Sequence, residues 1–169
     1  MAPPPTRLFT LASSVLAVLV DGYASAGDSL PGHQAVVPGL PAWDCAGVYV
    51  QVVRVYGTEG NVASEVAQPL EAHPGHSLRG MQLDVSILRC VPTVDETAGE
   101  VVLPSKVAEE SAALRILTDA QRMTNVLVRA QAAGELPGCS ALVIDQWVSI
   151  GPSGGLGGGT LSLRVAVGG

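Results

Sequence analysis

The residue types that most often carry chemistry are sparse in this sequence, and its one close histidine pair comes first. His73 and His76 stand three residues apart in the segment His-Pro-Gly-His. Imidazole nitrogens bind zinc, but a zinc site takes four ligands, and only Glu71 adds another ligand type nearby in sequence. We therefore interpret the pair as solvated loop residues and predict neither a metal site nor a bound cofactor.

Two carboxylates, Asp84 and Asp145, fall in segments that we predict to be strands. A pair of carboxyl groups can serve as general acid and general base. Polar residues that alternate with apolar ones along a strand normally face water, however. The sequence also has no Gly-x-Ser-x-Gly motif and no evident Cys–His arrangement for nucleophilic catalysis. We predict that the protein is not an enzyme.

A glycine-rich segment covers residues 151–159, with the sequence Gly-Pro-Ser-Gly-Gly-Leu-Gly-Gly-Gly. Glycine-rich loops that bind phosphate lead into the N-terminus of a helix, often through a Gly-Lys-Ser/Thr ending. This segment lacks that ending and leads into a predicted strand. We interpret it as a flexible hairpin connection that becomes ordered against a partner.

Three cysteines, Cys45, Cys90 and Cys139, are widely spaced and form no Cys-x-x-Cys motif. Buried thiols that pack as small apolar groups are the simplest interpretation. If the strands on either side of residues 57–77 form a hairpin, one register places Cys45 opposite Cys90, with Cys139 near them. A disulfide then requires an oxidising environment and suitable geometry, and the sequence leaves the thiol or disulfide state open.

The two tryptophans, Trp43 and Trp147, are large side chains in a chain with only 4% aromatic residues. Their ordinary role is core packing, although tryptophan is also enriched at the centres of protein interfaces. Our candidate contacts with other subunits or partners are these two residues together with Gly154, Gly155, Leu156 and Gly157.

An amphipathic helix from about Ser105 to Ala133 has the clearest sequence pattern. Ser105 is a good N-cap residue, Gly134 is typical of a helix C-terminus, and Pro137 prevents continuation. Apolar residues recur at helical spacing between these ends, while Asp119 and the arginines fall elsewhere on the helix. The predicted apolar stripe consists of Ala113, Ile116, Leu117, Ala120, Met123, Leu127 and Ala130.

Alternation of apolar and polar residues predicts strands at about residues 48–56, 81–88, 141–150 and 160–167, with a shorter one at 34–37. Residues 57–77 and 91–104 are predicted loops. The order helix, two strands, helix, two strands predicts a single α+β domain over residues 1–169. We expect a mainly antiparallel sheet with an N-terminal helix and the long second helix packed on it.

The N-terminal helix depends on an ambiguous apolar segment at residues 8–20. Read as a helix capped by Thr6, the segment has an apolar face made of Leu8, Leu11, Val15, Leu19 and Gly22. Read as a secretory signal peptide, it precedes Ala-Ser-Ala at 24–26, which has the form of a cleavage site. The single arginine and three prolines before it, and Asp21 after it, favour the docked helix; the leader is the alternative.

Charged residues make up 14% of the sequence, against about 25% in ordinary soluble domains. A surface so poor in charge is expected when other subunits cover part of it. The net charge of −6 and the scattered basic residues argue against a protein that grips nucleic-acid phosphates, because such a protein needs a clustered basic patch.

The order of elements resembles that of the tail terminator, or tail completion, proteins of long-tailed phages. Four short phrases resemble neck and tail proteins of phages that infect actinobacteria. The phrases are Pro-Ala-Trp-Asp-Cys at 41–45, Arg-Cys-Val-Pro at 89–92, Ile-Leu-Thr-Asp-Ala-Gln-Arg at 116–122 and Gly-Pro-Ser-Gly-Gly at 151–155. The resemblance spans most of the chain.

This resemblance implies a virion structural protein that is assembled in the host cytoplasm into a ring, usually of six copies. Such a ring caps the tail tube and binds the head–tail connector protein, and genomic DNA passes through its lumen without specific binding. The family shares no catalytic motif, so no residue inherits a chemical role, and no membrane is implied. Two alternatives remain: another phage neck protein, such as a head–tail stopper or adaptor, and a secreted small binding domain whose residues 1–26 are a signal peptide.

Overall fold

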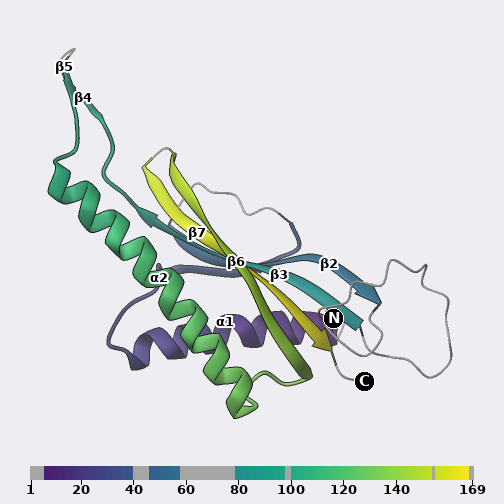
Figure 1. The fold of residues 1–169 in the computed structure, drawn as a ribbon. Coiled ribbons are helices and arrows are strands. Elements are labelled where there is room, and N and C mark those ends of the chain that lie inside the picture. The colour runs from purple at the N-terminus through teal and green to yellow at the C-terminus, as the bar shows by residue number, and fades with distance from the viewer. Residues whose placement is uncertain (1–5, 40–45, 58–78, 98–99, 154, 168–169) are drawn as a thin grey trace, which may run out of the picture.

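The computed structural model describes residues 6–39, 46–57, 79–97, 100–153 and 155–167. Its elements, in chain order, are α1 (Arg7–Ser25), β1 (His33–Val37), β2 (Gly47–Gly57), β3 (Arg79–Cys90), β4 (Asp95–Thr97), β5 (Glu100–Val102), α2 (Lys106–Ala133), β6 (Cys139–Ser153) and β7 (Leu156–Val167). Figure 1 shows both helices on the same side of one sheet, and the small β4–β5 hairpin extending away from it. The α+β fold predicted from the sequence is confirmed.

The large sheet has the strand order β1-β2-β3-β7-β6. Its neighbouring strands are antiparallel except for β1 and β2, which run parallel. β3 and β7 pair over their full lengths, from Arg79 opposite Val167 to Cys90 opposite Leu156. The alternating apolar residues of these strands therefore stand side by side on one face of the sheet.

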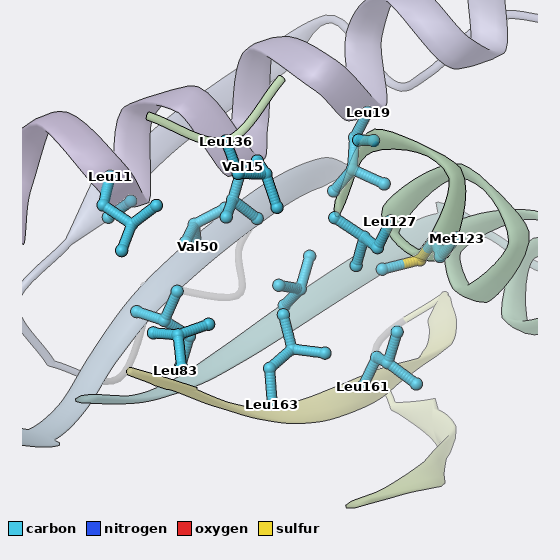
Figure 2. Packing of buried hydrophobic residues seen from close by; sticks show 14 of the residues in the cluster. Leu11, Val15, Leu19, Val50, Leu83, Met123, Leu127, Leu136, Leu161 and Leu163 are labelled. Atoms are coloured by element: carbon cyan, nitrogen blue, oxygen red, sulfur yellow. The ribbon is translucent and has the colours of Figure 1, made fainter. Parts of the chain in front are cut away.

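The hydrophobic core lies between this face and the two helices. Figure 2 shows Leu11, Val15 and Leu19 of α1 pointing toward Leu83 of β3 and Leu163 of β7. All five side chains are fully buried. Because burial of one such side chain contributes about 1.5–3 kcal/mol, α1 is a substantial part of what holds the sheet and helices together.

α1 begins where the sequence predicted. The hydroxyl of Thr6 caps it by accepting a hydrogen bond from the backbone amide of Phe9 at 3.3 Å. Gly22 of α1 lies against α2, and a Cβ added there would lie 2.6 Å from a methyl carbon of Val126. Among the described residues, α1 is also the one helix long and apolar enough to span a membrane, a property that core helices and signal sequences share.

The apolar residues of α2 that are buried in the core all lie in its C-terminal half. Met123, Leu127 and Ala130 are buried there, whereas no residue between 106 and 118 is buried. The predicted apolar stripe is therefore wrong in its N-terminal part, because Ala113 and Leu117 are exposed to solvent. The predicted caps are confirmed: Ser105 accepts a hydrogen bond at the N-terminus, and Gly134 ends the helix with a φ of 71°.

Two predicted loops contain regular structure. Residues 91–104 include β4 and β5, which pair antiparallel. The glycine-rich segment is strand for most of its length, because β6 continues to Ser153 and β7 begins at Leu156. Gly159, within β7, lies against the indole of Trp147, and an added Cβ would overlap that ring. Glycine at this position makes room for a large neighbouring side chain. The prediction that residues 151–159 form a flexible hairpin connection did not anticipate this packing.

Candidate interaction surface and buried ionic network

The two tryptophans predicted as contacts are placed unequally. Trp43 lies outside the described residues. Trp147 is partly buried against the core, and its ring nitrogen Nε1 is buried without an acceptor in the part of the chain that the structure describes. Core packing is therefore the role that the structure gives to Trp147, and a partner contact stays a prediction.

The predicted glycine-rich contacts lie around the turn from β6 to β7. Gly154 is outside the described residues, and Gly155 turns the chain with a φ of 82°. Leu156 is half-buried and Gly157 is buried. An added Cβ at Gly157 would lie 3.7 Å from the side chain of Ile116 on α2, so this glycine lies beside the helix. Contact of these residues with a partner also stays a prediction.

The two predicted strand carboxylates have separate structural partners. Asp84 on β3 accepts a hydrogen bond from the hydroxyl of Ser162 at 2.8 Å. Asp145 on β6 accepts one from Nε of Arg164 at 2.7 Å. Both interactions join neighbouring strands, which is the ordinary role of polar residues on the outer face of a sheet.

The predicted histidine pair and Glu71 lie outside the described residues. Within the described ranges, no three His, Cys, Asp or Glu side chains gather in a way that could hold a metal ion.

The cysteines do not gather as the sequence suggested. Cys45 lies outside the described residues, whereas Cys90 pairs with Leu156 and Cys139 with Val167, at opposite ends of β7. The expected proximity of Cys90 and Cys139 is therefore wrong. Cys90 is exposed and carries a free thiol. Burial raises the pKa of the Cys139 thiol, which donates a hydrogen bond to the backbone carbonyl of Ala141 at 3.3 Å.

Exposed apolar side chains occur beside and within the β4–β5 hairpin and along α2. Seven of the eleven large apolar side chains that are exposed among the described residues lie in these two places. We call these seven residues the apolar surface: Val94, Val102, Leu103, Val107, Leu114, Leu117 and Val128. The described residues 91–97 and 100–104, which we call the arm, include the β4–β5 hairpin and extend beyond the sheet at the N-terminal end of α2 (Figure 1).

The spacing of these residues on α2 resembles that of a helix that packs against another surface. Val107, Leu114 and Val128 are separated by multiples of seven residues, and Leu117 follows Leu114 by three. Leu114 and Leu117 are 67% and 60% exposed. Arg115 is the one charged residue among the exposed positions from 111 to 128. A solvated helix face normally carries many charges, so this face is unusually suited to be covered.

A buried ionic network lies between the other side of α2, α1 and the end of β3. Asp119 of α2 is 2% exposed and accepts hydrogen bonds from Nε and Nη2 of Arg89 at 2.6 and 2.9 Å. It also accepts one from the hydroxyl of Tyr23 at 3.0 Å. Burial, followed by the charge of Asp119, raises the pKa of Tyr23, and hydrogen bonding to Asp119 raises the pKa of Arg89. The network joins three elements far apart in sequence.

A second, more exposed carboxylate extends this network. Asp28 follows α1 and accepts hydrogen bonds from Arg115, at 2.9 Å, and from Arg122. The backbone amide of Ser29, together with Arg122, lowers the pKa of Asp28. The guanidinium of Arg122 also lies 5.2 Å from the ring centre of Tyr23. We call Asp28, Arg115 and Arg122 with Asp119 and Arg89 the ionic cluster.

Sequence reasoning missed this cluster, although a signal was present. Arg89 continues the core-facing alternation of Leu83, Val85 and Ile87, and Asp119 stands four residues before buried Met123. Charged residues that keep the phase of two core-facing patterns are expected to pair across the core, because an unpaired buried charge is strongly unfavourable.

No protein-family model matches this sequence, and no curated protein is significantly similar to it. Functional conclusions therefore depend on the surface and the cluster described above.

Proposed function

We propose that this protein is a structural subunit that assembles with copies of itself, and specifically a tail terminator of a long-tailed phage. In this role, copies form a ring, usually of six, that caps the tail tube and joins it to the head–tail connector. The observation that carries the proposal is the exposed apolar surface on the arm and α2. The resemblance in element order and the low content of charged residues support it.

The energetic argument starts from the most exposed side chains. Leu103, Val107, Leu114 and Leu117 are each 60–71% exposed. Full burial of such a side chain contributes about 1.5–3 kcal/mol, so covering all four contributes roughly 4–8 kcal/mol. That is a large share of what a specific protein contact needs, since a micromolar dissociation constant corresponds to about 8 kcal/mol.

A second copy of the chain is the occupant that the charges favour. With a net charge of −6, two copies repel each other when their acidic surfaces meet. Among the exposed positions of α2 from 111 to 128, Arg115 is the one charged residue, so copies that meet over these positions bring no carboxylate of this range into the contact. The arm extends from one end of the subunit (Figure 1), which suits a contact between two different surfaces. Repeated contacts of that kind form a ring when the rotation from one subunit to the next closes, and a filament when it does not.

The second candidate is a secreted binding domain with a cleaved leader, and the length and apolar composition of α1 favour it. Cleavage after residue 26 would remove Leu11, Val15 and Leu19 from the core, and would also remove Tyr23 from Asp119. These contacts support retention of α1. The intact mass of the mature protein distinguishes the candidates: loss of residues 1–26 supports the secreted domain.

The experiment on assembly measures the mass of the full-length protein by light scattering at micromolar concentration, with electron microscopy of the same sample. We expect the unmodified protein to form closed rings. We expect Leu114→Glu/Leu117→Glu to be monomeric with unchanged helical circular dichroism, because two charges then enter the contact.

The matched control is Phe9→Glu/Ala17→Glu, which places two charges at exposed positions of α1. This variant should assemble like the unmodified protein. A monomeric unmodified protein, or rings that persist in Leu114→Glu/Leu117→Glu, would show that the proposal is wrong.

A further inference from the structure

The large sheet has two outer strands, β1 and β6, each paired on one side in the part of the chain that the structure describes. Backbone N–H and C=O groups on the other side of such a strand can pair with a further strand. β6 is 15 residues long, and none of its residues is buried. Within the described residues, no backbone hydrogen bond joins β1 or residues 140–153 to a segment other than their one partner strand.

The free edge of β6 contains one regular stretch without a charge. Register shifts lie just before Gln146 and just after Ile150, so the residues from 146 to 150 pair with β7 without interruption. Asp145 is the one charged residue of β6, and Arg164 binds it. Natural proteins protect long edge strands with lysines, prolines or bulges. The five residues from 146 to 150, which we call the β6 run, have none of these within them.

β1 and the β6 run lie at opposite ends of the same five rows of the sheet, where a row is a set of residues that stand opposite one another on successive strands. His33, Gln34, Ala35, Val36 and Val37 share their rows with Ile150, Ser149, Val148, Trp147 and Gln146, in that order. Residues in one row are on the same face of the sheet. Val36 and Trp147, for example, both pack against the core.

We propose that the β6 run pairs with β1 of a neighbouring copy, so that the two sheets join into one. This inference rests on the proposed self-assembly and names a backbone contact within it. β1 and β6 run in opposite directions in the sheet, so a neighbour in the same orientation presents its β1 antiparallel to the β6 run. Continuing the rows places Gln34 of one copy opposite Ser149 of the next.

The match between the two edges favours β1 of a second copy as the occupant. Both segments are five residues long, and pairing in row register keeps core-facing residues with core-facing residues, whereas a slip of one residue would mix the faces. Neither segment has an Asp, Glu, Lys or Arg, so the contact adds no repulsion between copies that each have a net charge of −6. Two different edges can also repeat the contact from copy to copy, whereas β6 paired with β6 stops at two copies.

The first test places charges on both edges of the full-length chain. Gln34 and Ser149 are exposed, so lysine at either position is compatible with the fold. Gln34→Lys/Ser149→Lys brings like charges opposite each other and should raise the protein concentration at half-assembly about fivefold or more. Gln34→Glu/Ser149→Lys brings opposite charges together and should stay within about twofold of the unmodified protein.

The matched control is Val53→Lys/Val55→Lys. It adds the same charge at valines that are each 41% exposed on β2, a strand already paired on both sides. This variant should assemble within about twofold of the unmodified protein. Equal assembly of the two Gln34/Ser149 variants, with circular dichroism unchanged, would overturn the contact.

The second test measures amide hydrogen exchange in the unmodified protein below and above its assembly concentration. Successive amides of a strand point to opposite edges, so about two or three of the five amides in each segment face the free edge. We expect these amides to exchange more slowly in the assembled protein, in residues 33–37 and in residues 146–150 together. Protection of residues 146–150 alone would indicate β6 paired with β6, and would overturn the assignment of β1.

The outcomes separate this inference from the proposed function. If the unmodified protein assembles and Leu114→Glu/Leu117→Glu does not, while neither edge gains protection, the edge contact is wrong and self-assembly stands. If the unmodified protein does not assemble, both proposals fail.

Discussion

Replacement of Asp119 by alanine should destabilise the protein strongly, although the residue belongs to a helix that is largely exposed. The carboxylate is 2% exposed, and the side chain of its partner Arg89 is 14% exposed. Removing one member of a buried ion pair typically destabilises by about 3–5 kcal/mol, because the remaining charge stays buried and unpaired. Tyr23 loses its acceptor carboxylate but keeps the backbone carbonyl of residue 119 at 3.3 Å, so its loss adds little.

The assay is urea unfolding followed by circular dichroism, with all variants at one protein concentration because assembly would also stabilise the folded state. With a denaturant slope of about 2 kcal/mol per molar, a loss of 3–5 kcal/mol lowers the unfolding midpoint by roughly 2 M. Asp145→Ala is the matched control. It removes an ion pair with Arg164 whose side chains are 24% and 30% exposed, and its effect should be about 1 kcal/mol or less.

A double variant tests the pairing itself. Arg89→Met/Asp119→Leu replaces both charges by apolar groups, so it should be more stable than Asp119→Ala. Its loss of unfolding free energy should be well below the sum of the losses caused by the two single substitutions. A loss under 1 kcal/mol for Asp119→Ala, equal to that of the Asp145 control, would show that Asp119 and Arg89 are not a buried pair in solution.

Two further predictions concern residues that contact this core. Because burial and Asp119 raise the pKa of Tyr23, its phenol stays protonated in the folded state while the unfolded chain ionises near pH 10. The contribution of Tyr23 to the unfolding free energy is complete below pH 10 and declines above it by about 1.4 kcal/mol per pH unit. Tyr23→Phe should therefore flatten the fall in unfolding free energy between pH 10 and 11. An unchanged slope would contradict a raised pKa of Tyr23 in the folded state. Gly159→Ala should destabilise by about 1–3 kcal/mol and alter tryptophan fluorescence, because its Cβ overlaps the indole of Trp147. Gly151→Ala, with open space around its added Cβ, is the control, and equal stability of the two variants would refute the packing argument.

The sequence predicted those parts of the fold that local chemistry determines. Thr6, Ser105 and Gly134 mark helix ends because caps satisfy backbone groups that the helix leaves unpaired. Strand alternation predicted which residues of β3 and β7 face the core, since a strand has a period of two.

The parts that failed depend on tertiary contacts. Glycines have no side chain that could show the apolar–polar alternation of a strand, so the sequence did not place Gly157 and Gly159 in β7. In the structure, Gly157 lies beside Ile116 and Gly159 lies against Trp147. The sequence also could not show where α2 leaves the sheet, because Ile116 is in phase with Met123 and Leu127 on the helix and yet is only partly buried. The candidate interaction surface was therefore less predictable than the fold. Its decisive property is that its apolar side chains are exposed, and exposure depends on tertiary packing.

The one-sided support of α2 has a mechanical consequence. From Ser105 to Asp119 the helix rises about 20 Å without a buried residue before 119. The contacts described above for this length, Arg115 with Asp28 and Ile116 beside Gly157, lie in its last turn. A tilt of about ten degrees at the Asp119 end would displace the tip by about 3–4 Å for a rigid rod of that length. Small changes in the tilt of α2 around Met123 are thus magnified at the arm. The arm can therefore meet a neighbouring surface at a range of angles while the core of the domain keeps its packing.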